Sequence, residues 1–160
     1  LGKKNGYQYL WKEAEGTAID TIVQLTFLNK NTYYTVSSLV QDTAEVFYTR
    51  TGANDPDFNL RHEPAFIIRK NGKDQSFISV IEIHGKFDPV YEFSSNAYPS
   101  VKQIKLLQND SDYSVAEIMI GDKKLLIAQS NNSTDDTKKH TTRGISWTGP
   151  FSVLLDGKKL

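Results

Sequence analysis

The chain has 160 residues, and its 19 Lys and Arg residues balance its 19 Asp and Glu residues, so the formal net charge is zero at pH 7. This balance argues against a nucleic-acid-binding protein, which usually carries a basic surplus. Cysteine is absent, which excludes a disulfide framework, a thiolate zinc site and a cysteine nucleophile. The length predicts a single domain over residues 1–160, with a sub-boundary near residues 95–100 as the alternative. Because the first residue is Leu1 rather than Met, we expect a processed product or a fragment of a longer protein.

The first third of the chain has the patterns of β-strands. Residues 19–28 nearly alternate and are rich in β-branched side chains, which predicts a long half-buried strand. Residues 32–40 and 44–50 predict two further strands. Residues 51–64 then show no periodicity, and a loop of about 14 residues is long enough to indicate a function or disorder. Because this loop contains Phe58, Leu60 and Arg61, we expect it to pack on another part of the protein.

The remaining strands are expected to form hairpins. An Asn71-Gly72 turn predicts that residues 65–70 pair with residues 76–85. Gly121-Asp122 predicts a type II′ turn between residues 114–120 and 123–129. Further strands are expected at residues 101–108, 144–147 and 151–156. About ten strands and no convincing helix predict an all-β fold, an antiparallel β-sandwich or jelly-roll-like arrangement of stacked sheets.

Glu82 and His84 are the most suggestive pair of ionisable residues. They are two residues apart on a predicted strand, so both point to one face of the sheet. Such a pair could bind a metal or move protons. The alternative is that both side chains sit at the end of a sheet and hydrogen-bond to the backbone of a loop. The sequence leaves both interpretations open.

The 51–64 loop offers a second group of candidates. Arg61 and Glu63 flank His62, and an arginine on an ordered loop can bind a carboxylate or a sulfate with two hydrogen bonds. An internal salt bridge that fixes the loop is the alternative. Residues 55–59 begin like a calcium-binding EF-hand loop, but Leu60 and Phe66 replace the glycine and the glutamate that such a loop needs.

Aromatic residues make up 11% of the chain, and exposed Tyr and Trp rings are surfaces on which sugar rings stack. The alternative is that most of them are core residues of the sandwich. The candidates are Tyr7, Tyr9, Trp11, Tyr33, Tyr34, Tyr91, Tyr98 and Trp147.

Two segments resemble a known enzyme family. Residues 51–66, which read TGANDPDFNLRHEPAF, resemble a stretch of bacterial alginate lyases of the heparinase II/III-like group. Residues 77–85, which read FISVIEIHG, resemble the strand that follows it, where the family commonly has Glu-Pro-His-Gly and this chain has Ile83 in place of the proline. The resemblance covers residues 7–95 well and the remainder loosely.

The resemblance implies an architecture and an activity. Family members have an N-terminal helical toroid followed by antiparallel β domains, and they cleave uronic-acid polysaccharides by β-elimination. No catalytic motif and no zinc motif of the family matches this chain, so the resemblance implies a C-terminal β portion with no catalytic residue, metal or cofactor of its own. The expected partners are a uronic-acid polysaccharide and the toroid, with no nucleic acid and no membrane span, and the expected location is the periplasm or the cell exterior.

Within that resemblance, four residues are candidate substrate contacts. We expect Arg61 to pair with a uronate carboxylate, and Glu63, Glu82 or His84 to hold sugar hydroxyls or the wall of the cleft. Three roles remain open for the chain: an accessory β domain of a lyase, a free-standing carbohydrate-binding module, and a structural domain that provides an interface. A structural domain separated from its partner should expose a sizeable apolar patch.

Overall fold

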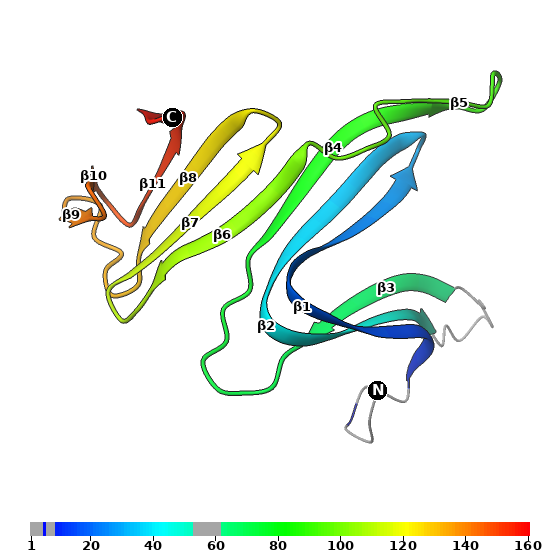
Figure 1. Cartoon of the computed structure of the whole chain (residues 1–160), viewed down its shortest axis with the longest axis horizontal. Coiled ribbons are helices and arrows are strands. Elements are labelled where there is room, and N and C mark those ends of the chain that lie inside the picture. Colours follow the sequence, from blue (N-terminus) through cyan, green and yellow to red (C-terminus); the bar gives the residue numbers. More distant parts are fainter. Residues whose placement is uncertain (1–4, 6–8, 53–61) are drawn as a thin grey trace. The chain divides into compact units, whose positions relative to one another are not determined.

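The computed structural model describes residue 5, residues 9–52 and residues 62–160 of the chain. The described residues form antiparallel β-strands almost throughout, so the predicted all-β class is confirmed (Figure 1). Among them, no helix is long and apolar enough to cross a membrane.

Twelve strands are found in the described part of the chain. In chain order they are β1 (Leu10–Asn29), β2 (Thr32–Gly52), β3 (His62–Arg69), β4 (Ser79–Asp88), β5 (Phe93–Ser95), β6 (Val101–Asn109), β7 (Tyr113–Ile120), β8 (Lys123–Ser130), β9 (Lys139–Thr142), β10 (Ile145–Thr148), β11 (Phe151–Leu155) and β12 (Lys158–Lys159).

The pairing of β3 and β4 differs from the predicted hairpin. Both strands pair with β2: Glu45–Gly52 pairs with β3, and Thr32–Ser38 pairs with β4. The Asn71-Gly72 signal is local, whereas the 21-residue β2 offers two separate stretches of backbone partners. The non-local pairing therefore prevails, and the expected hairpin was wrong.

The long β2 also replaces two predicted strands. The polar residues 41–43 suggested a break, but the strand continues through Asp42, whose φ is 57°. The side chain of Asp20 accepts a hydrogen bond from the Asp42 N–H at 2.7 Å, which satisfies the backbone at this irregular point. The chain thereby keeps one uninterrupted strand.

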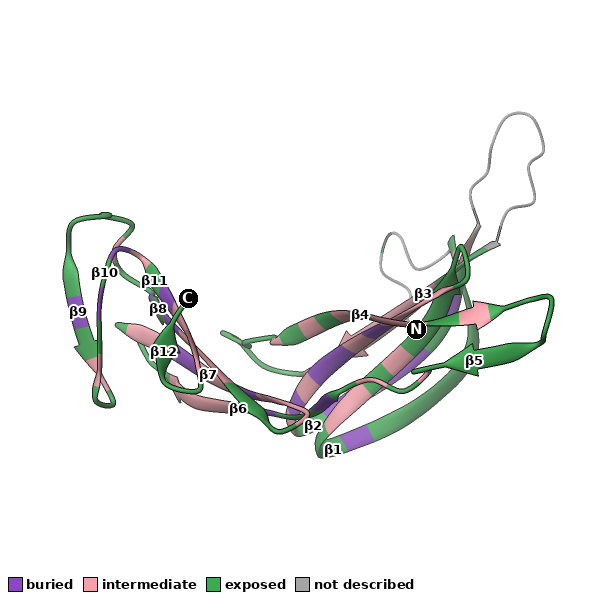
Figure 2. Cartoon of the chain, turned by 90° about the horizontal axis from the view of Figure 1, so that it is seen from above, coloured by how far each residue is buried: buried purple, intermediate pink, exposed green. Residues whose placement is uncertain are grey.

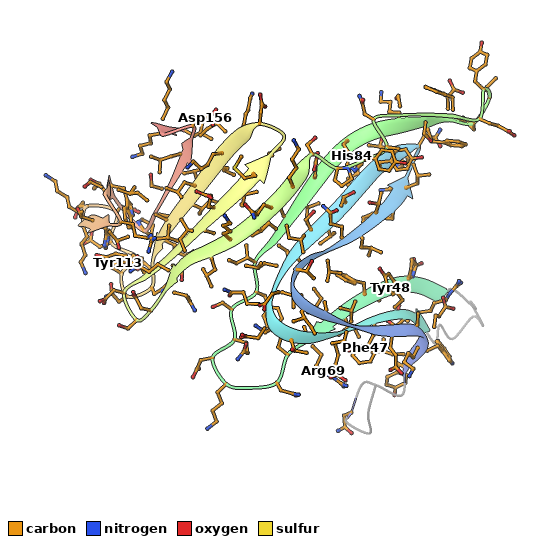
Figure 3. The ribbon with its side chains drawn as sticks, in the orientation of Figure 1. Phe47, Tyr48, Arg69, His84, Tyr113 and Asp156 are labelled. Carbon is orange, nitrogen blue, oxygen red and sulfur yellow. The ribbon has the colours of Figure 1, made fainter. Side chains whose placement is uncertain are left out.

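The described residues group into two compact units, and β1 and β2 contribute to both. Unit 1 comprises residues 1–23 and 40–77, and unit 2 comprises residues 24–39 and 78–160. Ala18, Val40, Ala44 and Val46 form the core of unit 1. Elsewhere in unit 1, the guanidinium of Arg69 lies 4.7 Å from the centre of the Phe47 ring and 2.8 Å from the Glu45 carboxylate (Figure 3). The prediction of one domain with a sub-boundary near residues 95–100 stays a prediction.

Unit 2 contains a dry core between two antiparallel sheets. The sheet β12-β11-β8-β7-β6 packs against the two-stranded sheet of β9 and β10. Val115, Ala128 and Trp147 form this core, and Trp147 is only 4% exposed. His140 stacks on Trp147 with ring centres 5.3 Å apart, and Tyr113 meets both rings edge-on. We call this cluster the dry core.

The hairpin of β7 and β8 is confirmed. The two strands pair in register from Tyr113 with Ser130 to Ile120 with Lys123. Gly121 has a φ of 62° at the first central position of the turn, as a type II′ turn requires.

Candidate functional site

The four predicted contact residues fall in different parts of the structure. Arg61 lies outside the described residues, so its predicted role is untested. Glu63 is an exposed residue of β3 in unit 1, and its carbonyl oxygen accepts a hydrogen bond from Thr51 Oγ1 at 3.3 Å. Glu82 and His84 lie on β4 in unit 2, and they are the two that the structure brings together.

The carboxylate of Glu82 binds backbone. Its two oxygens accept the N–H of Ser100, each at 2.8 Å, and one of them also accepts the N–H of Val101 at 3.1 Å. Partial burial raises the pKa of Glu82, but the hydrogen bonds from Ser100 and Val101 lower it by more in total. The pKa of this carboxyl therefore lies below its ordinary value, and the group is an anion at neutral pH.

His84 is held at both ring nitrogens. Its Nδ1 lies 2.8 Å from the carbonyl oxygen of Asn96, which can only accept, so Nδ1 carries the proton. In the neutral ring, Nε2 then accepts from Thr35 Oγ1 at 2.8 Å, and Thr26 Oγ1 donates to Thr35 Oγ1 at 2.7 Å. The ring also stacks on Tyr33, with 6.0 Å between centres.

Gly85 lets the same segment approach β4. Its φ is 52°, and a Cβ atom at this position would overlap the carbonyl oxygens of Ser95 and Asn96. A residue with a side chain would therefore push this segment away from β4. We call Glu82, His84, Gly85 and the residues 95–101 that they hold the polar junction.

The polar junction fixes the connection from β5 to β6. Gln24 adds to it from β1, because its amide donates to Ser37 Oγ at 3.0 Å and to the Val101 carbonyl at 3.1 Å. Thr35 and Ser37 are fully buried beneath it. The sequence pattern missed Thr35, although its alternation with the neighbouring tyrosines on β2 places it on the face of Tyr33.

The arrangement favours the structural interpretation of Glu82 and His84. Both oxygens of Glu82 and both ring nitrogens of His84 already have hydrogen-bond partners from the protein. Within residues 9–52 and 62–160, no group of three or more acidic or histidine side chains is placed to hold a metal ion. These two residues can therefore organise a loop, which was one of the two predicted alternatives.

The opposite face of the same strands is apolar and open. Ile81 pairs with Val36 and Ile83 with Tyr34, and the two isoleucines are 68% and 66% exposed. Phe27 of β1 stacks on Tyr34 with 5.5 Å between ring centres. In Figure 2 exposed and less exposed residues alternate along β4. We call Phe27, Tyr34, Val36, Ile81 and Ile83 the apolar face.

The predicted aromatic surface is only partly exposed. Tyr9, Trp11, Tyr91 and Tyr98 are exposed, whereas Trp147 belongs to the dry core. Tyr33 and Tyr34 lie on opposite faces of β2, and Tyr7 is outside the described residues.

Two curated proteins are similar to almost the whole chain. One is named an exo-oligoalginate lyase of Saccharophagus degradans, with 34% identity over 99% of this chain and 22% of its own length. The other is named an alginate lyase of Stenotrophomonas maltophilia, with 34% identity over 96% of this chain and 21% of its own length. The chain thus spans about one fifth of the length of these relatives. No protein-family model matches the chain.

Proposed function

We propose that the chain is the C-terminal β portion of a heparinase II/III-like polysaccharide lyase, in which it does no chemistry itself and supports or shapes the substrate cleft. The observation that carries this proposal is the similarity to two alginate lyases along 96–99% of the chain. On this proposal the whole enzyme acts on a uronic-acid polysaccharide in the periplasm or outside the cell.

In such an enzyme the reaction is β-elimination. The uronate carboxylate is neutralised, a base removes the proton from C5, and an acid protonates the leaving oxygen. We assign none of these roles to this chain, because the side chains of Glu82 and His84 are engaged with backbone and hydroxyl groups. Glu82, His84 and Glu63 would serve the cleft by holding its wall, and Arg61 by pairing with a uronate.

The apolar face supports a second, compatible role as an interface. The covered face of β2 and β4 is polar, while the open face carries Ile81 and Ile83. A sheet with one face in water usually has the opposite arrangement, with apolar residues on the covered face and polar residues on the solvated face. Exposed apolar patches mark interaction sites. Since the relatives are several times longer than this chain, we propose that the rest of the same polypeptide, including an N-terminal toroid, covers this face.

Two assays test the proposed function. The chain alone, mixed with alginate, should produce no unsaturated uronate by ultraviolet absorbance, whereas the full-length polypeptide should produce it. In the full-length polypeptide, the double variant Ile81→Ser and Ile83→Ser should lower both activity and melting temperature. The isolated chain with the same changes should stay as stable as before.

A matched control uses an exposed ring elsewhere. Phe151→Ser changes an exposed residue of β11 and should leave the full-length protein unchanged. Turnover of alginate by the isolated chain would refute the non-catalytic assignment. A full-length isoleucine double variant that behaves like the wild type would refute the interface.

A further inference from the structure

A bulge in β4 sends one lysine to the open face of the sheet. Tyr33 pairs with His84, but its neighbour Thr32 pairs with Lys86, so Gly85 is an extra residue on β4. Paired residues share a face in an antiparallel sheet. Lys86 therefore lies with Thr32 on the side of Ile83, opposite to His84, whereas simple alternation would place it beside His84. Bulges commonly redirect a side chain in this way next to functional sites.

The neighbouring strand adds an aromatic ring and a hydroxyl to the same face. Lys86 pairs with Ser95, and Asp88 pairs with Phe93. The ring of Phe93 is 64% exposed. An exposed ring beside an ammonium group and a hydroxyl combines the contacts that a charged sugar can use.

These residues line an open pocket in unit 2, between the ends of two hairpins. The pocket has a volume of about 600 Å³, within the usual range for small-molecule sites. The β1–β2 turn contributes Lys30 and Asn31, and β4 and β5 contribute Lys86, Phe93 and Ser95. Figure 1 shows the β4–β5 hairpin that carries the second group.

The two lysines of the pocket have no carboxylate partner among the ion pairs of the described residues. Asp88 also lines the pocket, but its Oδ1 accepts the N–H groups of Val90 at 2.9 Å and Tyr91 at 3.2 Å and so holds the turn. The ammonium groups therefore remain available to an anionic ligand.

Lys30 occupies a backbone conformation that does not suit a lysine. Its φ is 46° and that of Asn31 is 64°, so both central residues of this two-residue turn are left-handed. Such turns favour Asn or Gly at both positions, and the turn alone gives no reason for a lysine. Unfavourable backbone conformations often accompany functional side chains.

We propose that this pocket binds one uronate residue of an acidic oligosaccharide, with Lys30 and Lys86 at the carboxylate, Phe93 under the sugar ring, and Asn31 and Ser95 at hydroxyl groups. This inference rests on the proposed function, because it takes the substrate class from it. It adds a subsite that uses none of the four residues predicted from the sequence.

The test is a titration of the 160-residue chain followed by NMR. The probes are an oligomannuronate and a neutral cello-oligosaccharide of the same length. We expect shifts in the amides of residues 30–32, 86–88 and 93–95 with the uronate alone, and weaker binding as salt is added. Shifts confined to other residues, equal binding of the neutral sugar, or no binding at millimolar uronate would each overturn the proposal.

Variants distinguish binding in the pocket from a general attraction between the uronate and the lysines of the protein. Lys30→Asn with Lys86→Gln should weaken uronate binding at least tenfold, and Phe93→Ala should weaken it severalfold. The control is Lys123→Gln with Lys158→Gln, which removes two exposed lysines from β8 and β12 and should leave affinity within twofold. Equal losses of uronate affinity in both double variants would overturn the proposal that this pocket is the binding site.

Lys30→Asn alone gives a readout that a structural role cannot give. Because Asn tolerates the left-handed conformation better than Lys, the melting temperature should stay the same or rise while affinity falls. Loss of both stability and binding would assign Lys30 a structural role and overturn its part in the site. Failure of uronate binding by the chain would leave the lyase assays of the full-length protein unaffected, so the two proposals fail separately.

Discussion

The polar junction and the dry core each hold a segment of the chain against a sheet in unit 2, one by hydrogen bonds and the other by apolar packing. The junction holds residues 95–101 through hydrogen bonds to Glu82 and His84, with a glycine that permits close approach. The dry core holds β9 and β10 through Val115, Ala128 and Trp147, and among the described residues Nε2 of His140 and Nε1 of Trp147 have no hydrogen-bond partner. In the polar junction, directional hydrogen bonds fix the segment. In the dry core, the burial and close packing of apolar side chains fix it. The stability of the dry core should therefore depend on side-chain volume, whereas that of the polar junction should depend on hydrogen bonds and on the glycine.

The largest effect should come from the dry core. Trp147→Ala should lower the free energy of unfolding by about 3–5 kcal/mol, because it leaves a large cavity. Trp147→Phe keeps an aromatic ring and removes an indole N–H for which the described part of the chain offers no partner, so it should cost much less. Denaturant unfolding measures both variants, and a loss for Trp147→Phe as large as that for Trp147→Ala would contradict the role of ring packing in the core.

Gly85→Ala should be the most damaging change in the polar junction. The left-handed backbone and the overlap with Ser95 and Asn96 together should cost about 2–4 kcal/mol. Gly121→Ala is the matched control, since Gly121 has a similar φ but no atom within 4 Å of the added Cβ. It should cost about 1–2 kcal/mol from the backbone alone. If thermal unfolding showed equal losses of stability for Gly85→Ala and Gly121→Ala, the close approach of Ser95 and Asn96 to Gly85 would contribute nothing.

Glu82→Gln should cost about 1–2 kcal/mol at neutral pH, because charged acceptors make the stronger hydrogen bonds. The pKa of Glu82 in the folded state lies below its ordinary value of 4.5, so its contribution is present above pH 4.5 and is lost as the pH falls through the folded-state pKa. The stability difference between wild type and variant should therefore shrink in acid. Denaturant unfolding from pH 7 to pH 3 measures it, and a constant difference would contradict the role of the charge.

Thr35→Val should have the smallest effect, about 1 kcal/mol, since it removes one hydroxyl from a chain of hydrogen bonds and keeps the volume. The better readout is the imidazole of His84, whose ¹⁵N shifts report which nitrogen carries the proton. Because the Asn96 carbonyl requires a proton on Nδ1, we expect Nδ1–H to dominate in both proteins, and the Nε2 shift should change in the variant because Nε2 loses the hydrogen bond from Thr35. An unchanged Nε2 shift would show that Thr35 does not donate to His84.

Sequence patterns predicted the local features of the fold and missed the non-local ones. The hairpin around Gly121 and the shared face of Glu82 and His84 follow from short-range rules, and the structure agrees. The partner of β3 did not follow, because the Asn71-Gly72 signal says nothing about competition from β2. The bulge at Gly85 was also missed, since an extra residue in a strand changes the face of Lys86 without changing the sequence pattern.

The candidate site shows the same limit. The sequence identified Glu82 and His84 as a pair. It could not show that backbone groups of Ser100, Val101 and Asn96 form hydrogen bonds with their side chains. Lys30 carried no signal because a two-residue turn without glycine does not stand out in a sequence. Only the fold brings its turn to the strands that carry Lys86 and Phe93.

The order in which the two units use the chain has a consequence for synthesis and engineering. Along the chain, residues 1–23 belong to unit 1, residues 24–39 to unit 2, residues 40–77 to unit 1 again and residues 78–160 to unit 2. No single cut can therefore release either unit as an uninterrupted piece. On the ribosome, residues 32–38 emerge before β4, their hydrogen-bonding partner, has been translated. Unit 1 can close first, while the early part of β2 must wait for a strand made more than forty residues later.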